Sequence, residues 1–238
     1  KADSEIRNAV NYGNILSSLN SVREKPNEIC SAIAGGVIAN NFGNVYYCAN
    51  FGEVKAYARD GVAISGGIIA QSLQENYSPY GGGTQSVIEN CIVYGKISAE
   101  SGVTTAKETD IFAYCGGVAA DCVAKISSCI VNAEITGSVN NATYYCGAIV
   151  GVATDGNTGS VKNWFLKTET LTLGMGAIAE YDQSSYFYTG VWQRVIIDKG
   201  STDYDGRFQM FSVETAQTLE KQDPYLEIFG VLGKYFPE

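Results

Sequence analysis

The chain has 238 residues, 25 acidic against 16 basic side chains and therefore a formal charge of −9, and it contains no histidine. Without histidine it cannot build a Ser-His-Asp triad, a Cys-His pair or an imidazole metal ligand, and an acidic chain is a poor nucleic-acid binder because phosphate contacts need positive charge. No run of about 18 apolar residues is present that would span a membrane, and the length suits one sizeable domain or two small ones.

A short pattern recurs five times: a small residue, Gly, Gly or Ala, and then two apolar residues. The leading glycines are separated by 31, 50, 31 and 29 residues, and the interval of 50 indicates one unit that carries insertions. The copies lie at 34–38, 65–69, 115–119, 146–150 and, more faintly, 175–179. Self-similarity at a fixed period of about 30 residues predicts a repeat architecture with its insertions in loops.

A second pattern follows the first: an apolar residue, two residues, Cys, three residues, Gly, one residue and another apolar residue. Copies lie at 45–54, 88–97 and 126–135, and a degenerate copy at 161–168 places Trp164 at the Cys position. An orphan copy at 6–15 places Ala9 there and lacks the Gly-Gly half. We therefore expect the chain, which opens at Lys1 as a mature or trimmed product would, to begin in mid-repeat or with a different cap.

The repeated runs are short, are rich in Val, Ile and Tyr, and are bounded by Gly, Asn, Ser and Asp, which is typical of strands and turns. No ten-residue stretch before Ser212 has helical periodicity. A 30-residue unit cannot bury its apolar face alone, whereas stacked units bury a continuous core. We therefore predict an all-β, repetitive β-solenoid over residues 1–180, a right-handed β-helix. Gly13, Gly52 and Gly95 are predicted at corners with positive φ, and the Gly-Gly pairs at close backbone approaches.

The cysteines follow the same period. Cys48, Cys91 and Cys129 share one repeat position, and Cys115 and Cys146 share another. Equivalent positions in stacked repeats lie about 4.8 Å apart, so we predict two inward ladders of reduced, buried thiols, with Ala9 and Trp164 ending the first. Disulfides are the alternative for some of them, and Cys30 and Cys122 fall outside both ladders.

These runs resemble the GLUG repeat of bacterial surface proteins. The resemblance rests on Ala34–Asn40 followed by Val45–Val54, and on Ile88–Ile97, and it covers about residues 6–179. The chain departs from the repeat where Ala39, Ala70 and Ala120 replace a glycine that survives as Gly151. The resemblance implies an exported, adhesin-like surface module, secreted or held at a bacterial cell surface, and it implies no catalytic residues.

The repeat fades after about Tyr181. Tyr186–Ile197 indicates one or two strands, and Ser212 is a plausible N-cap for a short helix to about Lys221, which Asp223-Pro224 would end. Because an open solenoid end exposes strand edges, we predict that residues 181–238 form a C-terminal cap. A separate small domain is the alternative.

Aromatic residues are the candidate binding residues. Tyr12, Phe51 and Tyr94 share one repeat position, and Tyr114 and Tyr145 share another, so they form either a platform for sugars or protein, or an aromatic ladder that only stiffens the stack. An inserted loop at 73–84 carries Tyr77 and Tyr80, and binding residues concentrate on such loops. A tolerated surface insertion is its alternative.

Four acidic residues are candidates for the acid and base of a glycosidase or for calcium ligands: Glu100, Glu108, Asp110 and Asp121. The alternative is that they are ordinary solvated charges on the surface. They lack calcium-loop spacing, and the triple glycine at 81–83 lacks the lysine of a phosphate loop. We therefore predict no cofactor, no metal and no catalytic residue. Two glycosylation sequons, at Asn76 and Asn141, carry little weight in a chain with bacterial resemblance.

The sequence thus favours a non-catalytic, exported and monomeric module that presents Tyr77, Tyr80, Tyr94, Tyr114 and Tyr145 to a host or bacterial glycan or protein. A carbohydrate-active enzyme on the same scaffold is the first alternative, and it needs carboxylates converging on one face. A passive spacer is the second alternative.

Overall fold

The computed structural model describes residues 4–22, 30–72, 85–102, 112–139, 144–154, 163–166, 173–182, 193–201 and 208–211. All regular secondary structure in these ranges is β, which confirms the all-β prediction. The described ranges hold no helix that could cross a membrane. The short helix predicted from Ser212 lies outside them.

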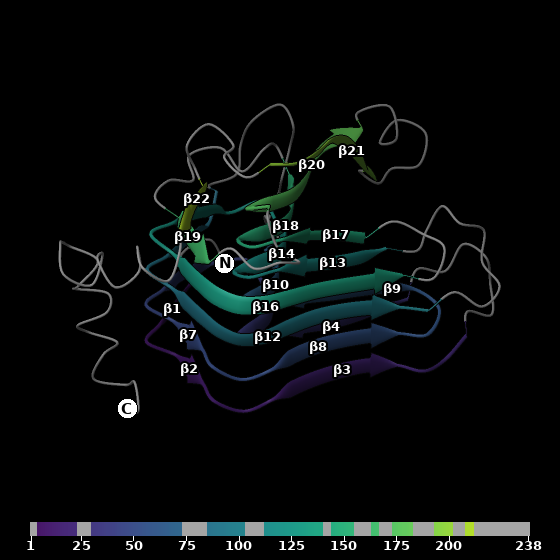
Figure 1. The fold of residues 1–238 in the computed structure, drawn as a ribbon, viewed down its shortest axis with the longest axis horizontal. Helices are drawn as coiled ribbons and strands as arrows, with labels where there is room; N and C mark the ends of the chain where they lie inside the picture. Colours follow the sequence, from purple (N-terminus) through teal and green to yellow (C-terminus); the bar gives the residue numbers. More distant parts are fainter. Residues whose placement is uncertain are drawn as a thin grey trace.

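The strands sort into four sheets, and each of the first four repeats supplies strands to all four (Figure 1). Sheet A contains β1 (Glu5–Arg7), β6 (Asn44–Tyr46), β11 (Val87–Glu89) and β15 (Lys125–Ser127). Sheet B contains β2 (Val10–Asn11), β3 (Ile15–Leu19), β7 (Ala49–Asn50), β8 (Val54–Ala58), β12 (Ile92–Ser101), β16 (Ile130–Val139), β19 (Asn163–Leu166) and β22 (Phe208–Phe211).

The second half of each repeat supplies the other two sheets. Sheet C contains β4 (Ser31–Gly35), β9 (Val62–Gly66), β13 (Ala113–Gly116) and β17 (Tyr144–Gly147). Sheet D contains β5 (Ile38–Asn41), β10 (Ile69–Ser72), β14 (Ala119–Cys122), β18 (Val150–Thr154), β20 (Met175–Asp182) and β21 (Gln193–Ser201). Every described strand pair is parallel except β20 with β21.

Equivalent repeat positions are hydrogen-bonded neighbours. Val45 pairs with Ile88, which pairs with Ile126, and Ser65 pairs with Cys115, which pairs with Cys146. The period seen in the sequence is therefore the spacing that sets strand register. Because the pairing is in register, each side-chain type forms a row that runs from repeat to repeat.

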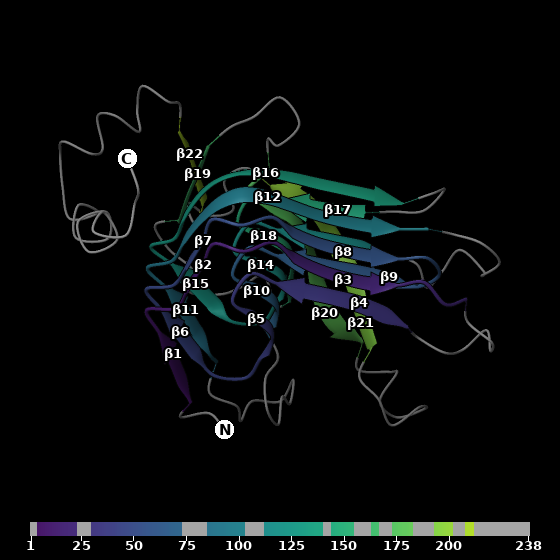
Figure 2. The ribbon, with the colours of Figure 1, turned by 90° about the horizontal axis from the view of Figure 1, so that it is seen from below.

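The sheets surround an interior (Figure 2), and the main cluster of buried hydrophobic side chains fills it. β8 packs against β9, and β12 against β13, so sheets B and C face each other over the second half of sheet B. Val54, Ile97 and Ile135 form one inward row of sheet B and are fully or almost fully buried. Alternating burial along β8 shows that one face of the sheet is inside and the other faces outward.

The Gly-Gly pairs sit where backbone meets backbone. A methyl group on Gly36 would collide with the carbonyl oxygen of Gly67, one on Gly67 with that of Gly117, and one on Gly117 with that of Ala148. This confirms the prediction of close approach. The prediction of positive φ at the corner glycines is only partly right.

Gly95 has a φ of 98°, but Gly13 and Gly52 are not among the described residues with positive φ. The left-handed corner lies one residue before the inward Cys or Ala of each repeat, at Asn8, Tyr47, Asn90 and Ser128, with φ between 54° and 58°. Gly52 is instead required by space, because a methyl group there would collide with the Gly13 carbonyl oxygen.

Both predicted cysteine ladders are present. All seven cysteines are free, and Cys48, Cys91, Cys115 and Cys129 are completely buried. The Sγ atoms of Cys48, Cys91 and Cys129 each donate to the carbonyl oxygen two residues earlier, at 3.3 Å. Burial raises the pKa of Cys91 and that of Cys122, the latter to about 12. These thiols behave as small apolar core residues.

The predicted end of the first ladder is wrong by one residue. Trp164 pairs with Ile130, so the residue aligned with Cys129 is Asn163. The buried Asn163 side chain accepts from the Cys129 amide at 3.2 Å and donates to the Ile126 carbonyl at 2.6 Å. At the position where the earlier repeats have a thiol, Asn163 therefore has an amide that makes two hydrogen bonds to the preceding repeat.

Candidate functional site

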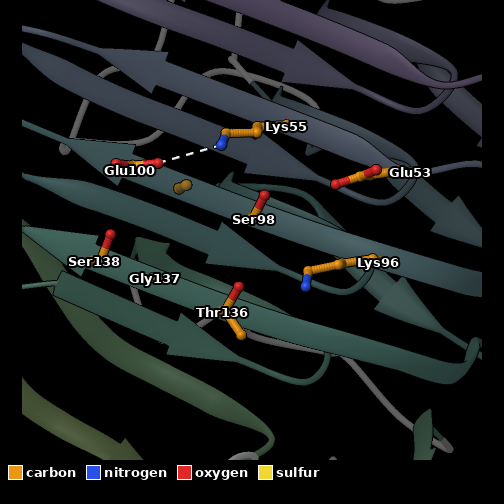
Figure 3. Close-up of a pocket in the computed structure, with 9 residues that line it drawn as sticks. Glu53, Lys55, Lys96, Ser98, Glu100, Thr136, Gly137 and Ser138 are labelled. Carbon is orange, nitrogen blue, oxygen red and sulfur yellow. Dashed lines mark ion pairs between the residues drawn. The ribbon is translucent and has the colours of Figure 1, made fainter.

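The outward face of sheet B brings together polar side chains from successive repeats. Lys55, Ser98 and Thr136 form one row of register partners, and Tyr57, Glu100 and Ser138 form the next. These rows border a shallow hollow of about 270 Å³ (Figure 3), lined by Glu53, Lys55, Lys96, Ser98, Ala99, Glu100, Thr136, Gly137 and Ser138. The strand alternation that buries one face holds these groups at fixed positions on the other.

Two ion pairs cross between repeats on this face. Lys55 Nζ lies 3.3 Å from a Glu100 carboxylate oxygen (Figure 3), and Lys96 Nζ lies 3.1 Å from one of Glu134. All four side chains are between 40% and 56% exposed, so the pairs add little to stability. Their exposed charged groups can instead donate and accept hydrogen bonds to a ligand, with each charge already balanced by its partner.

An aromatic ladder lies at one end of the same face. The rings of Tyr12 and Phe51 stack with centroids 5.1 Å apart and 11° between their planes, and those of Phe51 and Tyr94 with 5.7 Å and 17°. Tyr94 and Lys96 both lie on β12, so one strand carries the last ring of the ladder and part of the lining of the hollow. Tyr12 is 56% exposed, and on β16 the row continues with Asn132.

Inward amides hold the backbone beneath this ladder. Asn11 Nδ2 donates to Asn50 Oδ1 and to the Gly13 carbonyl, both at 2.7 Å, and Asn50 Nδ2 donates to the Gly52 carbonyl at 3.0 Å. Each asparagine thus spans the aromatic residue that follows it. The bonds from Asn11 to Gly13 and from Asn50 to Gly52 hold the backbone on both sides of Tyr12 and Phe51.

The second aromatic group is built into the packing of the molecule. The rings of Tyr114 and Tyr145 lie 6.0 Å apart, and Phe112, which shares no repeat position with them, stacks on Tyr114 at 5.9 Å. Both tyrosines are partly buried and pack against a patch on sheet D, formed by Val152, Ala177 and Ala179. These contacts favour a role for Tyr114 and Tyr145 in joining sheets C and D.

The structure does not bring the candidate carboxylates together. Glu100 lies on sheet B in its pair with Lys55, whereas Asp121 is buried on sheet D and accepts from Gln71 Nε2 at 3.1 Å. Glu108 and Asp110 lie outside the described residues, as do Tyr77, Tyr80, the whole 73–84 loop and both sequons. Among the residues that the structure does describe, no cluster of three or more His, Cys, Asp or Glu side chains could hold a metal ion.

Of the polar residues at this site, the sequence pointed only to Glu100, and its partner Lys55 was not predicted. Lys55 and Glu100 are 45 residues apart, and they become neighbours only through the register of β8 with β12. The signal that could have found them was the repeat period itself, applied to polar as well as apolar positions. No family model, curated protein or solved structure matches the chain.

Proposed function

We propose that this chain is a non-catalytic, exported surface module, a β-solenoid that binds a glycan on the outward face of sheet B. The observation that carries the proposal is the aromatic ladder of Tyr12, Phe51 and Tyr94 beside a hollow of balanced charges. The resemblance to GLUG repeats supports export and adhesin-like display. In-register parallel pairing of four repeats supports the solenoid.

A sugar ring has an apolar face and a rim of hydroxyl groups. Tyrosine and phenylalanine rings offer apolar area at low conformational cost, and Tyr12 is 56% exposed. The Lys–Glu pairs and Ser98 on the neighbouring rows can exchange hydrogen bonds with hydroxyl groups. Because four repeats contribute, the site suits a chain of sugars that crosses several strands.

The test is a glycan and host-matrix binding array with the wild-type chain and two tyrosine variants. Tyr12→Ala removes an exposed ladder ring, and we expect its affinity to fall about tenfold, the loss of one stacking contact. Tyr144→Ala is the matched control, since Tyr144 is 53% exposed but lies on sheet C. Equal loss in both variants, or none in Tyr12→Ala, would contradict the site.

The same samples discriminate the alternatives. Glu53 and Glu100 both line the hollow, so the enzyme alternative predicts new reducing ends on incubation with plant and host polysaccharides, and their loss in Glu100→Gln. An array with no bound glycan or protein favours the spacer. Binding without cleavage is the outcome expected here.

A further inference from the structure

The second cysteine ladder, Cys115 and Cys146, ends on β17, the last strand in the described order of sheet C. Cys115 on β13 and Cys146 on β17 are direct register partners in sheet C. Neighbouring strands lie about 4.8 Å apart, within the Cα separation of roughly 4.4–6.8 Å that a disulfide spans. Their thiols also hydrogen-bond each other, and burial together with this contact raises the pKa of Cys115.

Access distinguishes this pair from the other ladder. Cys146 is the one ladder thiol that is partly exposed, whereas Cys48, Cys91 and Cys129 are completely buried. Gly137 on β16 faces Cys146, and a methyl group there would press on its Sγ atom. The register partner of Gly137 in the preceding repeat is Ala99, so the missing methyl group at Gly137 makes room for the Cys146 Sγ atom itself.

We propose that Cys146 and Cys115 form a thiol–disulfide exchange site, at which a small-molecule disulfide oxidises the pair to a disulfide between two neighbouring repeats. The Cys146 thiolate attacks one sulfur of the small disulfide, which gives a mixed disulfide and releases one small thiol. The Cys115 sulfur then loses its proton and attacks Cys146 Sγ, which releases the second small thiol. Two protein thiols and one small disulfide become one protein disulfide and two small thiols.

The order of attack follows from burial. Cys115 is completely buried and its pKa is raised, so its thiolate is scarce and the second step is the slow one. Side chains at paired positions of parallel strands point in the same direction, and their Cβ atoms are about one strand spacing apart. This separation is slightly larger than the Cβ–Cβ distance of a relaxed disulfide. The product is therefore an easily reduced disulfide, whose formation depends on the ratio of small-molecule disulfide to thiol in the surrounding solution.

The experiment uses oxidised glutathione as the probe and the full chain in its folded state. Intact mass under non-reducing conditions should fall by the two thiol hydrogens, after a transient species carrying one glutathione. Proteolysis without reduction should then give a linked pair of peptides that contain residues 115 and 146. A glutathione adduct that stays on Cys146 in the wild type, a link to Cys48, Cys91 or Cys129, or no reaction at Cys115 and Cys146 would each overturn the proposal.

Three serine variants assign the steps. Cys115→Ser should stop at the mixed disulfide on Cys146, and Cys146→Ser should leave Cys115 unmodified. Cys30→Ser is the matched control, since Cys30 is also partly exposed but lies outside the ladders, and it should link as the wild type does. Should a variant lose its fold, the wild type compared in buffer and in urea still decides, because only the folded chain should link 115 with 146 alone.

Discussion

At the scale of the residue, glycine has two different uses in this molecule. Gly95 has a positive φ, whereas Gly36, Gly67 and Gly117 are needed because the next repeat places a carbonyl oxygen where a side chain would begin. Several other positions with left-handed backbone are occupied by non-glycine residues such as Asn8 and Asn90, whose short polar side chains tolerate a positive φ. Space rather than torsion therefore explains most repeated glycines.

Gly52 and Gly13 allow a matched test of this point, because they share one repeat position. A methyl group on Gly52 collides with backbone, so we expect Gly52→Ala to lower the free energy of unfolding by about 1–3 kcal/mol. On Gly13 it would meet only Asn11 Oδ1, at 3.6 Å, and Gly13→Ala should stay within about 0.5 kcal/mol of wild type. Urea unfolding measures both, and equal losses would show that torsion matters more than space.

At the scale of the element, strands are aligned by hydrogen bonds to the repeat beneath and not by the motif alone. β19 departs from the motif by one residue, because the buried amide of Asn163 bonds to both Cys129 and Ile126. Inward asparagines recur at Asn11 and Asn50, where they bond to the carbonyl of the glycine two residues on. Each polar group is buried only where it has a partner.

Asn163→Ala should therefore be costly. It leaves the Cys129 amide and the Ile126 carbonyl without these side-chain bonds, and we expect a loss of about 2–4 kcal/mol in the free energy of unfolding. Asn14→Ala is the control, since Asn14 is exposed and accepts only from the Glu53 amide, at 2.9 Å, among its described bonds. If the two variants lose equal stability in urea titrations, β19 is not held by its amide.

The sequence allowed the period, the strands, the Gly-Gly contacts and both cysteine ladders to be predicted, because each is a property of one repeated position. It did not allow the pairs Lys55–Glu100 and Lys96–Glu134 to be predicted, because each joins two repeats whose register must first be known. The motif also placed Trp164 at the thiol position, since spacing alone cannot show that a neighbouring Asn163 will bond inward. The aromatic ladder was predicted from position, but the polar hollow on the same sheet was not.

At the scale of the whole molecule, the repeats form a stack in which each contacts mainly its neighbours. In the first repeat, β1 is exposed, β3 alternates half-buried and exposed residues, and each has a described partner on one side only. In contrast, β12 is paired with β7 and β8 on one side and with β16 on the other. Ile6, Tyr12, Leu16, Val22 and Phe42 make up most of the large exposed hydrophobic side chains in the described ranges. Stability in such a stack is a sum of repeat and neighbour contributions.

We therefore expect amide protection to rise from the first repeat toward the middle. Peptides covering β3 should exchange deuterium at least about tenfold faster than those covering β12, because opening an end strand breaks one interface and opening a central strand breaks two. Hydrogen exchange read by mass spectrometry gives this profile directly. A uniform profile would indicate that the stack opens only as a whole.

The Gly-Gly contacts also determine which changes in the number of repeats the protein can tolerate. The carbonyl oxygen of Gly67 lies where a side chain on Gly36 would begin, and the carbonyl oxygen of Gly117 lies where a side chain on Gly67 would begin. The same dipeptide therefore makes a close backbone contact with the repeat on each side. A gene segment that encodes one whole repeat can accordingly be duplicated or lost by recombination, and each junction it makes is one the protein already contains. The molecule would change in length by steps of about 4.8 Å, while a fractional repeat would place side chains against carbonyl oxygens and be removed by selection.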